Sequence, residues 1–287
     1  RGDPANSITD KTEMKANIYI DGTDARAAFG VWVVRGGYND LLAYPAMKEP
    51  AANDWPEHDG LEVDLKAPKL QPLTVGIDCV ASGPKADVRG FVAALAVPGY
   101  RSILFPSLGR TFRLRLTNFD ELRDYGPLQS FRPLFELDEP ERTDAAVWQS
   151  PGTHVIRSAY TLDGINLADF GVFVQKGRDS LLRPAEVKQN LTREIATRDG
   201  RIYDTGIVRF NAKEIALKCC LKAVSTAAMW SCRDALFGRL TAPGEHTLNY
   251  RGKDYPVFYR ECTGTRLIAL RPGFILYEFE LNLTVIR

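Results

Sequence analysis

The chain has 287 residues, of which 45% are hydrophobic and 25% charged, so it is long enough for one large or two medium globular domains. Lys and Arg number 37 against 36 Asp and Glu, and a net charge of +1 argues against a protein that reads DNA sequence by neutralising many phosphates. No run of about 18 apolar residues occurs, which argues against a membrane-spanning helix.

Cysteine usage predicts free thiols. The count is odd and two of the cysteines are adjacent, which does not suit a disulfide framework. No Cys-x-x-Cys pair is present, so a zinc site is not expected either. We therefore expect reduced cysteines that pack as small hydrophobic side chains, as in a protein made in a cytoplasm: Cys79, Cys219, Cys220, Cys232 and Cys262.

The chain opens with a polar stretch, residues 1–16, which is predicted to be an N-terminal arm. Two strand-like segments follow, Asn17–Gly22 with the pair Asp21-Gly22, and the string Phe29-Gly30-Val31-Trp32-Val33. The same order returns later, with Asp163-Gly164 and then Phe170-Gly171-Val172-Phe173-Val174. The two Asp-Gly pairs are 142 residues apart (21 to 163), and a match at two consecutive motifs indicates an internal repeat.

The repeat continues through the rest of each half. Asp59-Gly60 matches Asp199-Gly200, and each pair precedes another strand-like stretch. An alternating apolar run then predicts a strand over 73–79 in the first half and 215–221 in the second. Amphipathic helices are expected over 85–97 and 226–240, each stopped by a Pro-Gly pair, and each followed by a hairpin and a last strand (133–137 and 275–285).

These patterns predict an α+β fold that is predominantly β. Two tandem modules are expected, residues 17–137 and 158–287, each a β-sandwich or barrel-like sheet with one flanking helix. The stretch 138–157 is polar, contains two prolines and lacks a sustained pattern, so it is interpreted as a linker.

Residues that could carry chemistry are few. His58, His154 and His246 each stand alone, and phosphate-binding loops and nucleophile elbows are absent from the sequence. No catalytic, cofactor-binding or metal-binding residue is therefore predicted. One cluster of carboxylates beside an aromatic side chain could suit a sugar hydrolase, although a solvated hairpin explains it as well: Trp55, Glu57, Asp59, Glu62 and Asp64.

The two Phe-Gly-Val strings are interpreted as core strands. Phe29, Val31 and Val33 would share one strand face, and the glycine would mark a bulge or a close backbone approach. Trp32 and Phe173 would then point the other way, either under the helix or toward a neighbouring subunit. Gly36-Gly37 and Gly177 are expected in hairpin turns, since no helical pattern follows them.

In this order of elements, from Ile20-Asp21-Gly22 through the Phe-Gly-Val string to the helix that stops at Pro-Gly, each half resembles the tail-tube module of long-tailed bacteriophages. That module occurs in tail-tube, distal-tail and baseplate-hub proteins. The family has no catalytic residues, so the resemblance implies a structural protein without cofactors. Distal tail proteins of the common kind have one such module, so the duplication departs from their pattern.

The resemblance further implies a ring around the channel through which DNA passes, without sequence-specific contact. Two modules per chain would fill six positions with three chains, so a trimer with pseudo-sixfold symmetry is preferred, and a hexamer is the other possibility. The expected partners are other tail proteins (tube, tip or hub), in a virion tail assembled in the bacterial host cytoplasm. The alternatives are a carbohydrate-active enzyme or a carbohydrate-binding adhesin built on duplicated β-domains.

Overall fold

The computed structural model describes residues 17–141, 147–189, 192–203 and 206–287, and the predicted arm 1–16 lies outside these ranges. The described chain forms two compact units. The first unit combines 17–38 with 75–136, and the second combines 39–74 with 137–287. No helix among the described residues is long and apolar enough to cross a membrane.

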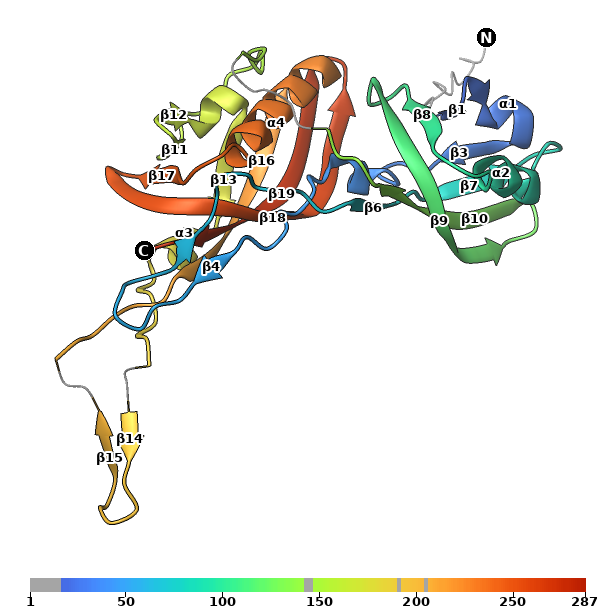
Figure 1. Ribbon diagram of the computed structural model, residues 1–287. Helices are drawn as coiled ribbons and strands as arrows, with labels where there is room; N and C mark the ends of the chain where they lie inside the picture. Colours follow the sequence, from blue (N-terminus) through green and yellow to red (C-terminus); the bar gives the residue numbers. More distant parts are fainter. Residues whose placement is uncertain (1–16, 142–146, 190–191, 204–205) are drawn as a thin grey trace, which may run out of the picture. The chain divides into compact units, whose positions relative to one another are not determined.

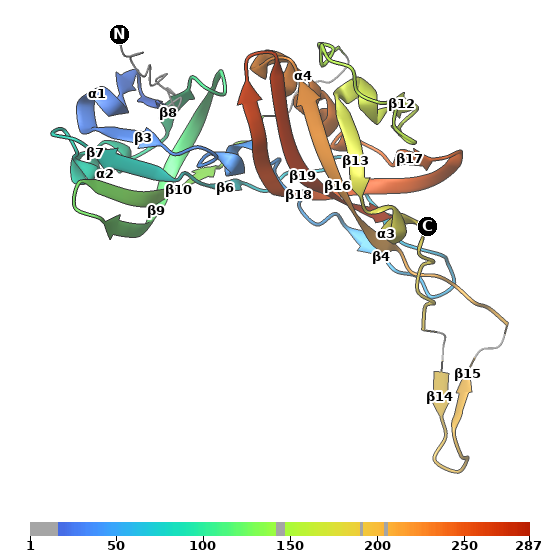
Figure 2. The same ribbon diagram turned by 180° about the vertical axis from the view of Figure 1, so that it is seen from behind.

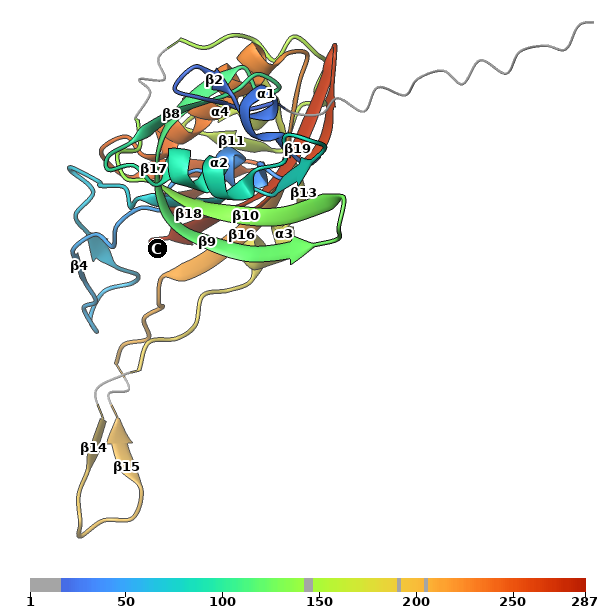
Figure 3. The same cartoon turned by 90° about the vertical axis from the view of Figure 1, so that its right-hand side faces the viewer.

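The first unit is built on one antiparallel sheet, whose strands follow the order β2-β1-β8-β9-β10-β7-β3, with β6 paired to β10. Its longest pair, β9 and β10, lies beneath helix α2 (Val88–Leu95) (Figure 3). The strands of this sheet are β1 (Tyr19–Ile20), β2 (Thr23–Asp24), β3 (Val31–Val33), β6 (Leu73–Gly76), β7 (Cys79–Ser82), β8 (Arg101–Phe105), β9 (Arg110–Asp124) and β10 (Leu128–Leu137).

The second unit is built on an antiparallel sheet of order β12-β11-β17-β18-β19-β16-β13, whose last four strands can be followed in Figure 2. Two small hairpins accompany it, β4 (Ala52–Asn53) with β5 (Glu62–Val63), and β14 (Thr192–Glu194) with β15 (Arg201–Tyr203). The strands of the sheet are β11 (Tyr160–Leu162), β12 (Ile165–Asn166), β13 (Val172–Lys176), β16 (Lys213–Ala223), β17 (His246–Tyr250), β18 (Lys253–Arg271) and β19 (Phe274–Val285).

The two sheets have the same connectivity. Counting each sheet's strands along the chain, β1, β2, β3, β7, β8, β9 and β10 correspond to β11, β12, β13, β16, β17, β18 and β19, and the spatial order is identical. The predominantly β fold with a flanking helix in each half is therefore confirmed. The repeat seen as short sequence motifs is a repeat of topology.

Both predicted flanking helices are present: the second has the predicted bounds 226–240, whereas the first, expected over 85–97, covers only Val88–Leu95. Helix α4 (Thr226–Leu240) begins after Ser225, whose hydroxyl accepts a hydrogen bond from the amide of Ala228, and it covers one face of the second sheet (Figure 1). The predicted apolar stripe of α4 is buried throughout: Met229, Cys232, Leu236, Phe237 and Leu240. In α2, Val88, Phe91 and Leu95 of the expected apolar stripe are buried and Val92 is half-buried, and Asp87 caps the helix.

The Phe-Gly-Val strings are not continuous strands, which corrects the prediction. Phe29 is the last residue of helix α1 (Ala25–Phe29), and Phe170 ends the 3-10 helix η2 (Leu167–Phe170). Gly30 and Gly171 follow with φ of 63° and 71° and end these helices, and the strand begins only at the valine. A glycine tolerates this left-handed conformation, so the motif encodes a helix stop rather than a strand face.

Two further local predictions were wrong. Gly177 was expected in a hairpin turn, but it precedes helix α3 (Arg178–Leu182), and Gly36-Gly37 precede the 3-10 helix η1 (Asn39–Leu42). Both helices are only one turn long, too short to leave an amphipathic pattern in the sequence. The strand expected over 73–79 is split between β6 and β7, whereas its counterpart β16 is continuous.

The compact units do not follow the contiguous ranges of the repeat. Residues 39–74, which belong to the first sequence copy, pack in the second unit. Residues 147–157 of the expected linker also pack there: the indole of Trp148 stacks on Phe170 at 4.7 Å, and the amide of Gln149 donates to the hydroxyl of Ser231 at 2.8 Å. The modules 17–137 and 158–287 therefore stay a prediction about the repeat, not a description of the packing.

Candidate functional site

The second unit is bound along its sheet by a segment of the first sequence copy, residues 43–72, which we name the first strap. The amide of Met47 donates to the carbonyl oxygen of Arg260 in β18 at 2.8 Å, and the strap's own backbone is joined where Lys48 donates to Lys69 at 2.7 Å. Farther on, the amide of Gly244, after α4, donates to the carbonyl of Leu65. Strand, helix end and strap thus form one continuous contact.

Aromatic packing holds the start of the first strap. The ring of Tyr44 stacks on Phe237 of α4 with centroids 4.4 Å apart, and Tyr259 of β18 meets it edge to face at 6.0 Å. The hydroxyl of Tyr259 donates to the carbonyl of Tyr44 at 3.2 Å. Burial raises the pKa of Tyr259 well above its ordinary value, so the phenol stays protonated and remains a donor.

Arg233 of α4 fixes the same region from the helix side. Its side chain is buried, and its guanidinium donates to the carbonyl oxygens of Leu42, at 3.0 Å, and Ala43. The guanidinium also lies over the ring of Tyr44 at 5.2 Å and pairs with Asp234 at 2.8 Å. A buried cation satisfied in this way ties the entry of the strap to α4.

The far end of the first strap meets a second buried cation, Lys188. Its ammonium group donates to the carbonyl oxygens of Trp55, at 2.9 Å, and Gly60, at 2.6 Å, and pairs with the carboxylate of Asp54. Only 6% of Lys188 is exposed, so its three donors are directed at the strap rather than at water.

At Gly60 the strap packs against the end of the described chain, just after β19. Its amide donates to the carbonyl of Phe210 at 2.7 Å, and Asp59 accepts from the amide of Phe210 at 2.9 Å while facing Arg209 at 3.5 Å. A Cβ added at Gly60 would lie 1.7 Å from the carbonyl oxygen of Ile286. Only glycine fits here, at a φ of 70°.

The carboxylate cluster considered from the sequence lies on the first strap. Glu62 accepts from the indole nitrogen of Trp55 at 2.8 Å, and Asp64 accepts from the amide of Lys66 at 3.1 Å. With Asp59 bonded to the backbone of Phe210, three of the four carboxylates hold the local chain in place. A hollow of about 830 Å³ is lined by strap residues 51–53 and 62–66 and by the turn 243–245, so it includes Glu62 and Asp64 but not Trp55.

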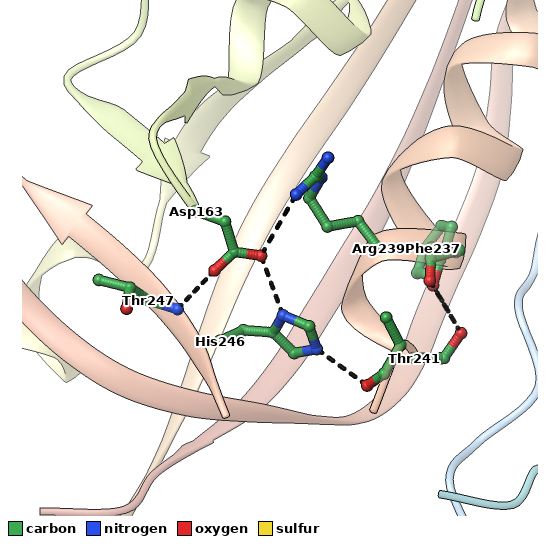
Figure 4. A network of polar contacts seen from close by, with 8 residues as sticks. Asp163, Phe237, Arg239, Thr241, His246 and Thr247 are labelled. Atoms are coloured by element: carbon green, nitrogen blue, oxygen red, sulfur yellow. Dashed lines mark hydrogen bonds and ion pairs between the residues drawn. The ribbon is translucent and has the colours of Figure 1, made fainter. Parts of the chain in front are cut away.

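Of the three histidines, His246 has a defined polar role (Figure 4). Its Nδ1 lies 2.9 Å from Asp163 and its Nε2 3.2 Å from the carbonyl of Ala242. Asp163 also accepts from the amide of Thr247 at 2.8 Å, and Arg239 lies 3.8 Å away. Burial acts to raise the pKa of Asp163, but these donors outweigh it and hold that pKa below its ordinary value.

The first unit has the same Asp-Gly turn, but a different basic side chain pairs with the aspartate. Asp21 accepts from the amide of Ser102 at 2.9 Å and pairs with Arg101 at 2.9 Å, which stands where His246 stands in the second unit. The hydrogen bond from Ser102 and the pairing with Arg101 lower the pKa of Asp21. Because an arginine replaces the histidine, this arrangement fixes a turn between strands in both copies, and an acid–base role is not common to them.

The described cysteines behave as the sequence indicated. All five are buried and free. Burial raises the pKa of Cys220 and Cys232 to about 11 and that of Cys262 to about 12, so these thiols stay protonated and poorly nucleophilic. Among the described residues, no group of three or more His, Cys, Asp or Glu side chains is placed to hold a metal ion.

Sequence reasoning missed the residues that make the strap contact. Lys188 and Arg233 lie 134 and 191 residues from Asp54 and Leu42, so no local pattern announces them. One signal was available: Lys48 and Lys188 occupy the same position in the two copies, 11 residues before the aspartate of the Asp-Gly pair in each.

No family model matches the sequence, and no curated protein matches it. Among solved structures, the chain is similar to the crystal structure of SPP1 Dit, described as a paradigm of the hub adsorption apparatus in Gram-positive infecting phages. The alignment covers 94% of this chain and 98% of that one at 13% identity. Its TM-score is 0.33, and at that level the likeness carries no argument about fold or function.

Proposed function

We propose that this protein is a structural component of a phage or prophage tail, in the distal-tail, hub or tube position, and that it forms a ring around the DNA channel. The observation that carries the proposal is the duplication: two antiparallel sheets with one strand order in a single chain. The order of elements in each copy resembles the tail-tube module, and this resemblance is the reason for proposing a phage tail protein.

The duplication also supplies a stoichiometry. A ring of six equivalent wall units needs three chains when each chain carries two of them, and head-to-tail contacts close most simply into a cyclic ring. Short strands end each sheet, β2 and β3 in the first unit and β12 and β13 in the second. Such edges have unpaired backbone groups that suit pairing between neighbouring units.

A wall unit acts by packing and surface charge, and the second unit uses its polar groups in that way. Asp59, Lys188 and Arg233 all hold chain segments together. The proposal accordingly assigns no catalytic residue and no cofactor. DNA passing through the ring would meet it without sequence-specific contacts, and neighbouring tail proteins would stack on its two faces.

Mass in solution and electron microscopy test the proposal together. Three chains of 32.0 kDa give about 96 kDa, and class averages should show a ring with a central hole. Because some rings assemble only on a partner, the same imaging is repeated with phage tail extract. A chain that stays monomeric in both settings contradicts the proposal. Oligosaccharide binding or cleavage by that monomer would favour the carbohydrate-active alternatives.

A further inference from the structure

We propose that the second copy carries an equivalent strap that binds a neighbouring molecule. This second strap (residues 183–189, 192–203 and 206–212) would lie across the first unit of another copy of the chain, as the first strap lies across the second unit of its own chain. The inference deepens the proposed ring and rests on it, because it names the contact through which the ring closes.

The two straps have the same backbone scaffold, offset by 140 residues (48 to 188). The amide of Lys48 donates to the carbonyl of Lys69 at 2.7 Å, and Lys188 donates to Arg209 at 2.7 Å. Isolated bridges join Met47 to Leu70 and Val187 to Phe210. The hairpins β4-β5 and β14-β15 follow at the same offset, and the turn glycines, Gly60 and Gly200, have φ of 70° and 77°.

The straps differ in burial. Leu42, just before the first strap, and Met47 within it are 0% and 7% exposed, whereas their counterparts Leu182 and Val187 are 52% and 58% exposed. The second strap exposes further large apolar side chains, which in a lone chain would face water: Ile195, Ile202, Tyr203, Ile207, Val208 and Phe210. The counterparts of Leu182, Val187 and Val208 are Leu42, Met47 and Pro68, all of which are buried. Apolar side chains that are exposed where their counterparts are buried indicate a missing partner.

We call the surface on which a strap lies its seat, and the first unit has a surface that corresponds to the seat of the first strap. In the second unit the first strap contacts β18 and the turn after α4, whose counterparts are β9 and the turn after α2. The strand pairing fixes which positions correspond: Arg101 pairs with Leu114 of β9 as His246 pairs with Val257 of β18. Three residues further along each strand, Thr117 of β9 therefore corresponds to Arg260 of β18. A hollow of about 470 Å³ lies there, lined by residues 95–99 and 115–119.

Burial in the two seats follows the presence of a strap. Tyr259, which the first strap covers, is fully buried, while its counterpart Leu116 in β9 is only half-buried. We therefore expect the amide of Val187 to donate to the carbonyl of Thr117 in the neighbouring copy, as Met47 donates to Arg260 within one chain.

The charges at the tips of the straps are complementary to the residues that they would meet in the neighbouring chain. Within one chain, Asp59 faces Arg209 and Lys188 holds the carbonyl of Gly60. In the proposed contact, each residue is replaced by its counterpart in the other copy. Asp199 of one chain then faces Lys69 of the next, and the carbonyl of Gly200 accepts from Lys48 of the next. Lys48, Lys69 and Asp199 are exposed, and their signs are complementary.

Charge reversal tests the contact on the full chain. Asp199→Lys should raise the concentration needed for half-assembly about tenfold, since losing one close ion pair at an interface has effects of that order. Adding Lys69→Asp should restore assembly, while Asp179→Lys, an exposed reversal outside the contact, should leave it unchanged. Full assembly of the Asp199→Lys variant, or a double variant no better than the single, would overturn the inference.

Cross-linking separates this inference from the proposed function. A chain with Lys69→Cys and Asp199→Cys, treated with a short bismaleimide, should give covalent dimers and trimers, and either single variant should not. The five native cysteines are buried and give little background. Rings that form without cross-links refute the strap exchange and leave the ring intact. Wild-type protein that never self-associates, alone or with tail extract, refutes both.

Discussion

Gly60 and Gly200 occupy corresponding turns and differ in their surroundings. Each follows an aspartate, Asp59 or Asp199, and each has a positive φ that disfavours side chains. Gly60 lies against the carbonyl oxygen of Ile286, whereas nothing lies within 4 Å of the position that a Cβ would take at Gly200. At the scale of single residues, the same motif therefore has a packed and an unpacked version in one chain.

Substitution of these two glycines should lower the stability of the protein by different amounts. Gly60→Ala adds a backbone clash to the strain of a positive φ and should lower the free energy of unfolding by about 2–4 kcal/mol. Gly200→Ala carries the strain alone and should cost about 1 kcal/mol. Urea unfolding of both variants measures the difference. Equal losses would mean that the contact between Gly60 and Ile286 has no energetic weight.

Asp163 predicts an acid-sensitive contribution to stability. Its pKa is lowered in the folded state, so the stabilisation is present above the unfolded value of about 3.9 and is lost as pH falls through the folded value. Asp163→Asn should cost about 1–2 kcal/mol at pH 7 and less as pH drops below about 4. Thermal melts between pH 3 and pH 7, compared with the wild type, check this. A pH-independent difference would contradict it.

At the scale of elements, α4 has two functions. One side completes the core of the second unit through its apolar stripe, and Arg233 on the same helix holds the carbonyls that lead into the first strap. A helix and a strap from different sequence copies thus share one set of contacts around Tyr44. Breaking that set should loosen the strap before it unfolds the sheet.

Arg233→Ala tests this order of events. The change removes both donors and leaves the buried carbonyls of Leu42 and Ala43 unsatisfied, so about 3–5 kcal/mol of stability should be lost. Hydrogen exchange should accelerate first at residues 43–48. Arg193→Ala, an exposed arginine in β14, serves as the control and should change neither quantity. Uniform acceleration across the second unit would argue against a separately anchored strap.

At the scale of the whole molecule, the unit of sequence and the unit of packing differ. The repeat divides the chain into contiguous halves, but residues 39–74 of the first half pack in the second compact unit. An element that belongs to one sequence copy therefore packs with the other. In the proposed ring, the same arrangement would repeat from one chain to the next.

Fragments of the second unit should reflect this exchange. Residues 137–287 alone would expose the seat of the first strap, including Tyr259 and Phe237, and should aggregate or unfold at low denaturant. The same fragment with residues 39–74 joined through a flexible Gly-Ser linker should unfold cooperatively at a higher denaturant concentration. Circular dichroism during urea titration compares them, and equal midpoints would contradict the role given to the strap.

The sequence by itself determined the elements that local patterns encode. Alternation predicted the strands around Leu217 and Phe279, a 3.6-residue stripe predicted α4, and Asp21-Gly22 with Asp163-Gly164 revealed the repeat. Short helices such as α3 were missed, because one turn leaves no periodicity. Phe29 was misassigned, because a helix stop and a strand start share one apolar string.

Only the tertiary structure decided where the first strap packs. The contact of Lys188 with Gly60 spans 128 residues, and that of Arg233 with Leu42 spans 191. Such contacts depend on burial and on hydrogen-bond geometry between distant segments, which neither composition nor spacing encodes. The sequence determined that there are two copies of one unit, and the fold decided that a segment of the first copy packs with the second. The physical reason is that Tyr44 finds its aromatic partners, Phe237 and Tyr259, in the other copy.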